Sequence, residues 1–331
     1  MPANLTPQYM EAEQRFKQAA THQEKVTCLE EMLRVIPKHK GTDKLQADLK
    51  RRLSKLRQEA QKSAGARRAA GPSVVKEGAG QIALLGLPNA GKSALVGTLS
   101  KAVTEVADYP FTTRKPIPGM VVYENVQIQL VDLPPISRDY MESWLQQIVR
   151  NADALLLVVD LSDAEALEAV EFACATLAEW KVSPVAPGTP TDPDDLPVGV
   201  VERPAMLLGT KYDVPDSADT WAMIEELYGG RWPRLAVSAF DGRNLEDLRA
   251  ALYALLGKIR VYTKAPGKKP DLTAPFTLPR GSTVSDVAAT VHKDFAVRLK
   301  FARIWGKEKY DGQMVQRDYV MQEEDVIELH V

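Results

Sequence analysis

The chain has few cysteines and no long apolar run, and both features limit the cellular compartments in which it is expected to act. Its only cysteines, Cys28 and Cys174, lie far apart and lack the spacing of a metal site. Such usage is typical of a reducing compartment and predicts a cytoplasmic location. The longest apolar run, residues 154–159, is far too short to span a bilayer. The first residues lack a basic region followed by an apolar stretch, so no secretion signal is predicted.

The chain also has almost no net charge. Its 42 basic and 44 acidic residues leave a formal charge of −2. No global field therefore draws it to nucleic acid, and any such contact must come from a local patch. We expect neither a DNA nor a membrane partner. A length of 331 residues with 45% hydrophobic content predicts a globular protein of two or three domains.

A phosphate-binding pattern is present near residue 90. Residues 86–93 read G-L-P-N-A-G-K-S, directly after the apolar run 81–85 and before a helix-like segment. In this order the glycines let backbone N–H groups surround phosphates, and the helix N-terminus adds positive potential. Lys92 is placed to reach the β- and γ-phosphates, and the Ser93 hydroxyl to ligate Mg²⁺. The predicted phosphate site consists of Gly86, Asn89, Ala90, Gly91, Lys92, Ser93 and Ala94.

A second pattern predicts which base is bound. Residues 206–213 form an apolar strand pattern ending in T-K-x-D, with Thr210, Lys211 and Asp213. The Asp213 carboxylate can accept hydrogen bonds from both N1–H and the 2-amino group of guanine. Alone, this motif is more often a surface turn. Together with the phosphate loop, and followed by Ser238-Ala239, it favours GTP and GDP as ligands.

The sequence between these motifs contains candidate switch residues. Asp132 follows the strand pattern 126–131 and is placed to hold the Mg²⁺ shell through water. Taken singly it would be a strand-end cap, but its place in the series favours the metal role. Residues 108–113, D-Y-P-F-T-T, resemble a first switch in which Thr113, or less favourably Thr112, closes on Mg²⁺ and the γ-phosphate. The predicted metal set is Ser93, Thr113 and Asp132, and the predicted catalytic residues are Lys92 and Thr113.

These motifs resemble the Obg branch of translation-factor-type GTPases. The C-terminal sequence, which includes I-R-V-Y-T-K at 259–264, H-K-D-F at 292–295 and F-A-R-I-W-G at 301–306, is similar to the TGS domain of the developmentally regulated GTP-binding proteins, the DRG subfamily. The resemblance covers nearly the whole chain. It implies a cytoplasmic GTPase that works with ribosomes or the translation machinery.

Two departures from the GTPase pattern bear on hydrolysis. The third motif, normally D-x-x-G, reads D-L-P-P at 132–135, and Pro135 has no N–H for the γ-phosphate. Ile136 stands where Ras-like enzymes place a water-orienting glutamine. Asn89 resembles the asparagine that helps hold K⁺ in potassium-activated GTPases, although a loop-stabilising role is an equal alternative. We therefore expect slow hydrolysis, with K⁺ or a partner as candidate activators.

The predicted fold class is α/β, with three domains. Residues 1–70 are predicted to form a helical hairpin with a basic arm, residues 78–258 a P-loop GTPase domain, and residues 259–331 a ubiquitin-like β-grasp TGS domain. The GTPase sheet is expected to be mostly parallel, with strand 128–131 nearer an edge. A capping box at 162–165 predicts a helix start, and the proline-rich stretch 183–204 predicts an exposed loop. In the TGS domain we expect strands at 260–263, 276–278, 302–305 and 326–329 around one helix, 284–293.

A local basic patch is the candidate partner surface. Residues 38–68 carry eleven Lys or Arg against three acidic residues, which predicts contact with rRNA or tRNA on the ribosome, aided by the TGS domain, or else a solvated helix face. Three functions follow as hypotheses. The first is a ribosome-associated GTPase, the second a non-hydrolysing GTP-binding scaffold, and the third an RNA-binding regulator tuned by nucleotide.

Overall fold

The computed structural model describes residues 11, 14–16, 22–36, 49–51, 53, 72–103, 115–190, 196–307 and 310–331. The chain divides into two compact units, Met1–Gly71 and Pro72–Val331. Most of the basic segment 38–68 and the switch candidates Thr112 and Thr113 lie outside the described residues. Within the described part, every helix is too short or too polar to cross a membrane.

The first unit contains helix α2 (His22–Val35). Leu29, Met32 and Ile36 recur at helical spacing and form a buried cluster with Leu49 and Leu53. All described residues before Ile36 and from 49 to 53 are helical, as the periodicity predicts. The neighbouring Lys50 and Arg51 are exposed, so this turn places apolar side chains inward and basic side chains outward.

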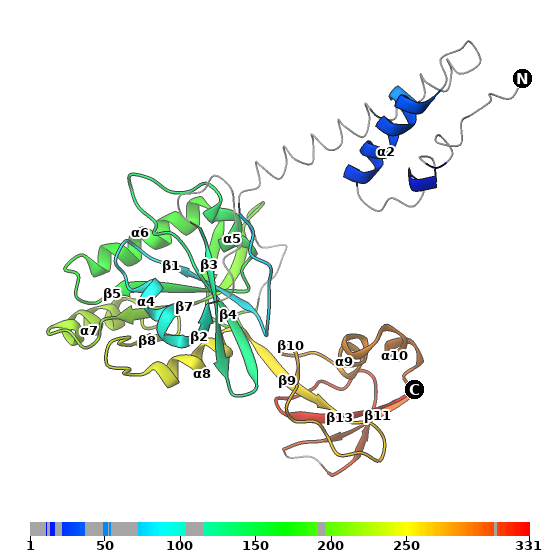
Figure 1. Cartoon of the computed structure of the whole chain (residues 1–331). Coiled ribbons are helices and arrows are strands. Elements are labelled where there is room, and N and C mark those ends of the chain that lie inside the picture. Colours follow the sequence, from blue (N-terminus) through cyan, green and yellow to red (C-terminus); the bar gives the residue numbers. More distant parts are fainter. Residues whose placement is uncertain are drawn as a thin grey trace, which may run out of the picture. The chain divides into compact units, whose positions relative to one another are not determined.

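The second unit contains a large, mostly parallel sheet, as predicted (Figure 1). Its strand order is β2-β3-β4-β1-β5-β7-β6, and β8 pairs with β7. Among the strand pairs of the described residues in this sheet, β2–β3 and β3–β4 are antiparallel and the others are parallel. The strands are β1 (Gln81–Leu85), β2 (Ser100–Val103), β3 (Ile117–Tyr123), β4 (Val126–Asp132), β5 (Ala154–Asp160), β6 (Val182–Val185), β7 (Val201–Thr210) and β8 (Arg234–Ala236).

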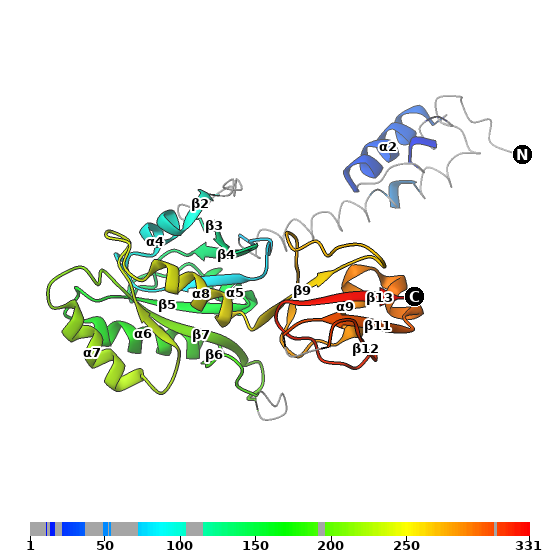
Figure 2. The ribbon, with the colours of Figure 1, turned by 90° about the horizontal axis from the view of Figure 1, so that it is seen from below.

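Helices cover both faces of this sheet. They are α4 (Lys92–Leu99), α5 (Leu145–Asn151), α6 (Ala166–Glu179), α7 (Ser217–Tyr228) and α8 (Leu245–Leu255). Figure 2 shows α4 and α8 on one side of the strands and α6 and α7 on the other. Ala83 and Leu85 of β1 join one core and Ile82 and Leu84 join the other. A strand buried on both faces needs a continuous apolar run, which explains the pattern at 82–85.

Three sequence expectations for this sheet are wrong. Strand β4 is internal, between β3 and β1, because β3 adds a further antiparallel strand outside it. The stretch 183–204 is not simply a loop, since β6 and the start of β7 pair in parallel across it. The predicted capping box at 162–165 does not form: α6 begins at Ala166, its N-cap Glu165 makes no side-chain cap hydrogen bond, and Asp163 instead accepts from the Glu165 N–H.

The C-terminal part forms the predicted β-grasp. Its sheet has the order β10-β9-β13-β11-β12, with β13 parallel to β9 and the other pairs antiparallel. Strand β12 and helix α10 were not predicted. The elements are β9 (Lys258–Thr263), β10 (Phe276–Pro279), α9 (Val284–Val291), α10 (Lys293–Arg298), β11 (Phe301–Trp305), β12 (Gln313–Val315) and β13 (Asp325–His330). A capping box of Thr283 and Asp286 starts α9.

A buried arginine joins the β-grasp to the β3–β4 hairpin. Arg260 of β9 is 5% exposed, and its guanidinium contacts Glu124 and Asn125 in the hairpin turn. Its Nε also donates to Glu323 at 2.6 Å. Burial alone would lower the pKa of Arg260, but the hydrogen bonds and charges of Glu124 and Glu323 raise it above the usual value. An arginine stays charged at physiological pH, and this one ties β9 to the hairpin that leads into Asp132.

Candidate nucleotide-binding site

The loop between β1 and α4 has the conformation that a phosphate cradle requires. Gly91, the N-cap of α4, has φ 82°, a left-handed conformation that favours glycine. At Gly86 an added Cβ would lie 2.4 Å from the carbonyl oxygen of Val158. Asn89 also adopts a positive φ, 61°. The glycines of the motif are thus needed for one left-handed turn and for one close approach between loop and strand.

Lys92 lies inside this loop. Its Nζ donates to the carbonyl oxygens of Gly86 and Leu87, both at 2.9 Å, and the residue is 6% exposed. Burial lowers the pKa of Lys92 to about 8, against the opposing charge of Asp132. The loop therefore holds a desolvated ammonium group whose protonated form an added polyanion would stabilise.

Ser93 and Asp132 form a pair beside the loop. The Ser93 hydroxyl donates to Asp132 Oδ2 at 2.5 Å. Among the described residues, the other carboxylate oxygen, Oδ1, is buried without a hydrogen-bond partner. Burial raises the pKa of Asp132, while Ser93 and Lys92 act to lower it. A hydroxyl oxygen and an unsatisfied carboxylate oxygen at the mouth of a phosphate loop are ligands that Mg²⁺ prefers, so these residues fit a magnesium ion.

The segment after Asp132 is fixed against the phosphate loop. The Ile136 N–H donates to the carbonyl oxygen of Gly86 at 3.2 Å, and the Ile136 side chain is fully buried in the core with Leu133. Ile136 therefore faces the core here, where it cannot orient a water molecule. Sequence reasoning identified the missing glutamine but not this anchor. The positions of Thr112 and Thr113 stay predictions, because they lie outside the described residues.

The base-reading motifs converge on one cavity of about 410 Å³. Helix α4 and its N-cap line one side of the cavity. The T-K-x-D motif at the end of β7 and the loop after β8 line the rest. Three segments that are separate in sequence, 91–98, 210–214 and 239–240, therefore meet at this cavity. The lining residues are Gly91, Ala94, Leu95, Thr98, Thr210, Lys211, Asp213, Val214, Ala239 and Phe240.

Thr210 links the base-reading loop to the phosphate loop. Its hydroxyl lies 2.9 Å from the carbonyl oxygen of Ala90 and 3.0 Å from that of Val159, so its single proton is shared between loop and strand. Thr210 is buried, and its contacts determine how the two loops are spaced.

Lys211 and Asp213 take different positions in the same loop. Lys211 has φ 58°, and its ammonium group pairs with Asp160 at 2.5 Å. Burial would raise the pKa of Asp160, but hydrogen bonds from Lys211 and Ser162 lower it overall. Asp213 is exposed at the cavity, where its carboxylate is free to meet a base. Asp160, at the end of β5, is a positioning residue that sequence reasoning missed.

Ser238 is fully buried and acts on its own loop. Its hydroxyl accepts the N–H groups of Phe240 at 3.1 Å and Asp241 at 3.2 Å. The neighbouring Ala239 lines the cavity. Of the S-A motif, Ser238 therefore shapes the turn, while Ala239 is the residue that lines the cavity.

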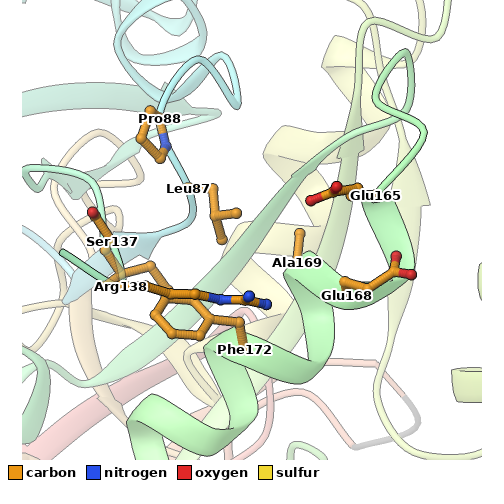
Figure 3. A pocket seen from close by; sticks show the side chains of 9 residues that line it. Leu87, Pro88, Ser137, Arg138, Glu165, Glu168, Ala169 and Phe172 are labelled. Carbon is orange, nitrogen blue, oxygen red and sulfur yellow. The ribbon is translucent and has the colours of Figure 1, made fainter.

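A smaller cavity, of about 230 Å³, lies beside Leu87 and Pro88 of the phosphate loop. Leu87, Pro88, Ile136 and the start of α6 line it. Figure 3 shows Arg138 extended across the ring of Phe172, with Glu168 of α6 and Glu165, the N-cap of that helix, beyond it. The guanidinium carbon of Arg138 lies 5.6 Å from the ring centroid. The segment after Asp132 thus rests on α6 through a cation–π contact between Arg138 and Phe172.

Three comparisons with known proteins found similar sequences and structures. Residues 81–185 match a family model described as 50S ribosome-binding GTPase, and residues 259–331 match the TGS domain. The chain is 30% identical to the uncharacterized GTP-binding protein MJ1326 of Methanocaldococcus jannaschii, over 92% of each chain. It is also 30% identical to developmentally-regulated GTP-binding protein 1 of Xenopus laevis, over 85% of this chain and 91% of that protein. The G domain of the T. maritima FeoB iron transporter aligns with 53% of this chain and 97% of its own, at 22% identity and a TM-score of 0.38.

Proposed function

The chain belongs to the family of developmentally regulated GTP-binding proteins, and on that premise we propose that it is a magnesium-dependent, slowly turning over GTPase that acts with ribosomes in the cytoplasm. One observation carries the nucleotide part of the proposal. A phosphate loop with a buried ammonium group adjoins a cavity lined by Thr210, Lys211 and Asp213. Phosphate and base recognition are therefore available at one site.

The roles of the residues follow from their chemistry. The Lys92 ammonium group and the loop amides hold the β- and γ-phosphates and neutralise charge that develops in the transition state. Ser93 and Asp132 would hold Mg²⁺, which would supply Lewis-acid stabilisation of the phosphate oxygens. Thr113 is proposed to complete this set when the first switch closes. Asp213 reads the guanine edge.

Slow turnover is proposed from the third motif. Pro135 offers no N–H to the γ-phosphate, and the Ile136 N–H is already bonded to Gly86. Water positioning must therefore come from the first switch, from K⁺ near Asn89, or from a partner. These same observations favour the alternative of a non-hydrolysing GTP-binding scaffold.

Single-turnover GTP hydrolysis separates the two functions. We expect measurable phosphate release in the presence of Mg²⁺, faster in KCl than in NaCl if Asn89 helps to bind the cation. An Asn89→Asp variant and a reaction with EDTA serve as controls. Release that stays absent in both salts, with and without ribosomes, would establish the scaffold instead.

Ribosome association is proposed from charge and from the family. The basic segment 38–68, the C-terminal TGS domain and the description of the matching family model all support it. Lys50 and Arg51, at described positions of this segment, are exposed beside the buried Leu49. Neutralising Lys50, Arg51, Lys55 and Arg57 together is expected to weaken co-sedimentation with ribosomes and reduce its dependence on salt. Unchanged co-sedimentation would mean that these basic residues face solvent and do not contact the ribosome.

A further inference from the structure

Phe240 is an unusual residue at the wall of the nucleotide cavity. It follows the S-A motif directly, and its side chain is 89% exposed. It lines the same cavity as Thr210, Lys211 and Asp213. Single exposed apolar residues are common on protein surfaces, so exposure alone assigns nothing. What distinguishes Phe240 is how firmly its backbone is held.

Ser238 holds the backbone of Phe240 in place. The buried hydroxyl of Ser238 accepts the N–H groups of both Phe240 and Asp241. The Ser238 N–H in turn donates to the carbonyl oxygen of Arg243 at 3.2 Å. The turn that presents the phenyl ring is thus closed by its own hydrogen bonds, without any ligand.

A second set of contacts ties this turn to the base-reading loop. The Asp241 carboxylate accepts the Arg243 N–H at 2.9 Å and pairs with its guanidinium at 3.1 Å. Arg243 also donates to the carbonyl oxygen of Tyr212 at 3.1 Å and lies over the Tyr212 ring, 5.6 Å from its centroid. Because Tyr212 lies one residue before Asp213, the position of Phe240 is coupled to that of the predicted guanine reader.

An exposed aromatic ring at the wall of a cavity of about 410 Å³, on a backbone that is held in place, fits a stacking surface. Every base has an apolar π-face, and stacking on an aromatic side chain stabilises it without reading its edge. We propose that Phe240 stacks on the guanine base and supplies affinity, whereas Asp213 supplies the choice of base. This inference rests on the proposed nucleotide site and adds a binding residue to it.

The test compares Phe240→Ala and Phe240→Tyr with wild type by calorimetry. Loss of one stacking contact should weaken GDP and GTP binding about ten- to hundred-fold, and by the same factor for both. Phe240→Tyr keeps the ring and should keep wild-type affinity. The preference for GDP over IDP, which lacks the 2-amino group, should not change in Phe240→Ala. Tyr310→Ala removes a comparably exposed ring (85%) from the TGS domain and is the matched control.

The outcomes separate this inference from the nucleotide site itself. If wild type binds GDP and Phe240→Ala binds it within two-fold, the stacking role is wrong and the site stands. If wild type binds no guanine nucleotide, the proposed function is wrong as well. An altered GDP-to-IDP preference would make Phe240 an edge reader instead. If Phe240→Ala misfolds, Phe240→Trp tests the stacking role instead. Its tryptophan fluorescence should change on GDP addition by more than that of wild type, and an equal change would contradict stacking.

Discussion

Replacing Arg260 with alanine should loosen the β-grasp from the β3–β4 hairpin. The guanidinium is buried and donates at 2.6 Å to Glu323 and at 3.1 Å to Asn125, with further contacts to Glu124 and Glu324. A hydrogen bond to a charged group contributes about 1.5–3 kcal/mol. The freed glutamates are partly exposed and regain water, so we expect a loss of about 3 kcal/mol rather than the full sum.

Hydrogen–deuterium exchange measures this loss locally. A loss of about 3 kcal/mol corresponds to roughly a hundred-fold fall in the protection of β9 and the β3–β4 hairpin. Arg260→Met keeps much of the apolar stem and separates packing from charge. Lys307→Ala is the control, because Lys307 is 86% exposed and pairs with Glu324 at the surface, which predicts less than about 0.5 kcal/mol. Equal exchange in Arg260→Ala and Lys307→Ala would refute the reasoning.

Three further predictions concern the nucleotide site. Asp213→Asn should weaken GTP binding at least about hundred-fold and admit xanthosine triphosphate, and unchanged GTP affinity by calorimetry would remove the base-reading assignment. Thr210→Val leaves the carbonyl oxygens of Ala90 and Val159 without the Thr210 hydroxyl, so thermal unfolding should show about 1–3 kcal/mol lower stability and GDP affinity should fall. Thr210→Ser keeps the hydroxyl and should retain wild-type stability and affinity. Equal behaviour of the two variants would contradict this prediction. GTP affinity should fall as the pH rises above about 8, because Lys92 loses its proton there in the free protein while bound phosphate raises its pKa. Lys92→Arg should remove that pH dependence, and a flat profile for wild type would show that Lys92 keeps its proton throughout.

Sequence alone determined the motifs whose residue types the chemistry demands. A phosphate loop is predicted by the glycines at 86 and 91 together with Lys92 and Ser93. Few residues other than glycine permit the left-handed turn and the close approach to β5, and the lysine supplies the positive charge. The apolar runs at 82–85 and 154–159 predicted buried parallel strands, since both faces of these strands are covered. Helical periodicity likewise predicted the packing of Leu29, Met32 and Ile36.

Contacts between distant residues were decided only by the tertiary structure. Three such contacts depend on strands that are adjacent in space but not in sequence. They join Thr210 to Ala90, Asp160 to Lys211, and Ile136 to Gly86. The internal place of β4 and the pairing of β6 with β7 are also non-local, since strand order carries no local signal. Periodicity reports which face of an element is buried, whereas only the folded chain determines what covers it.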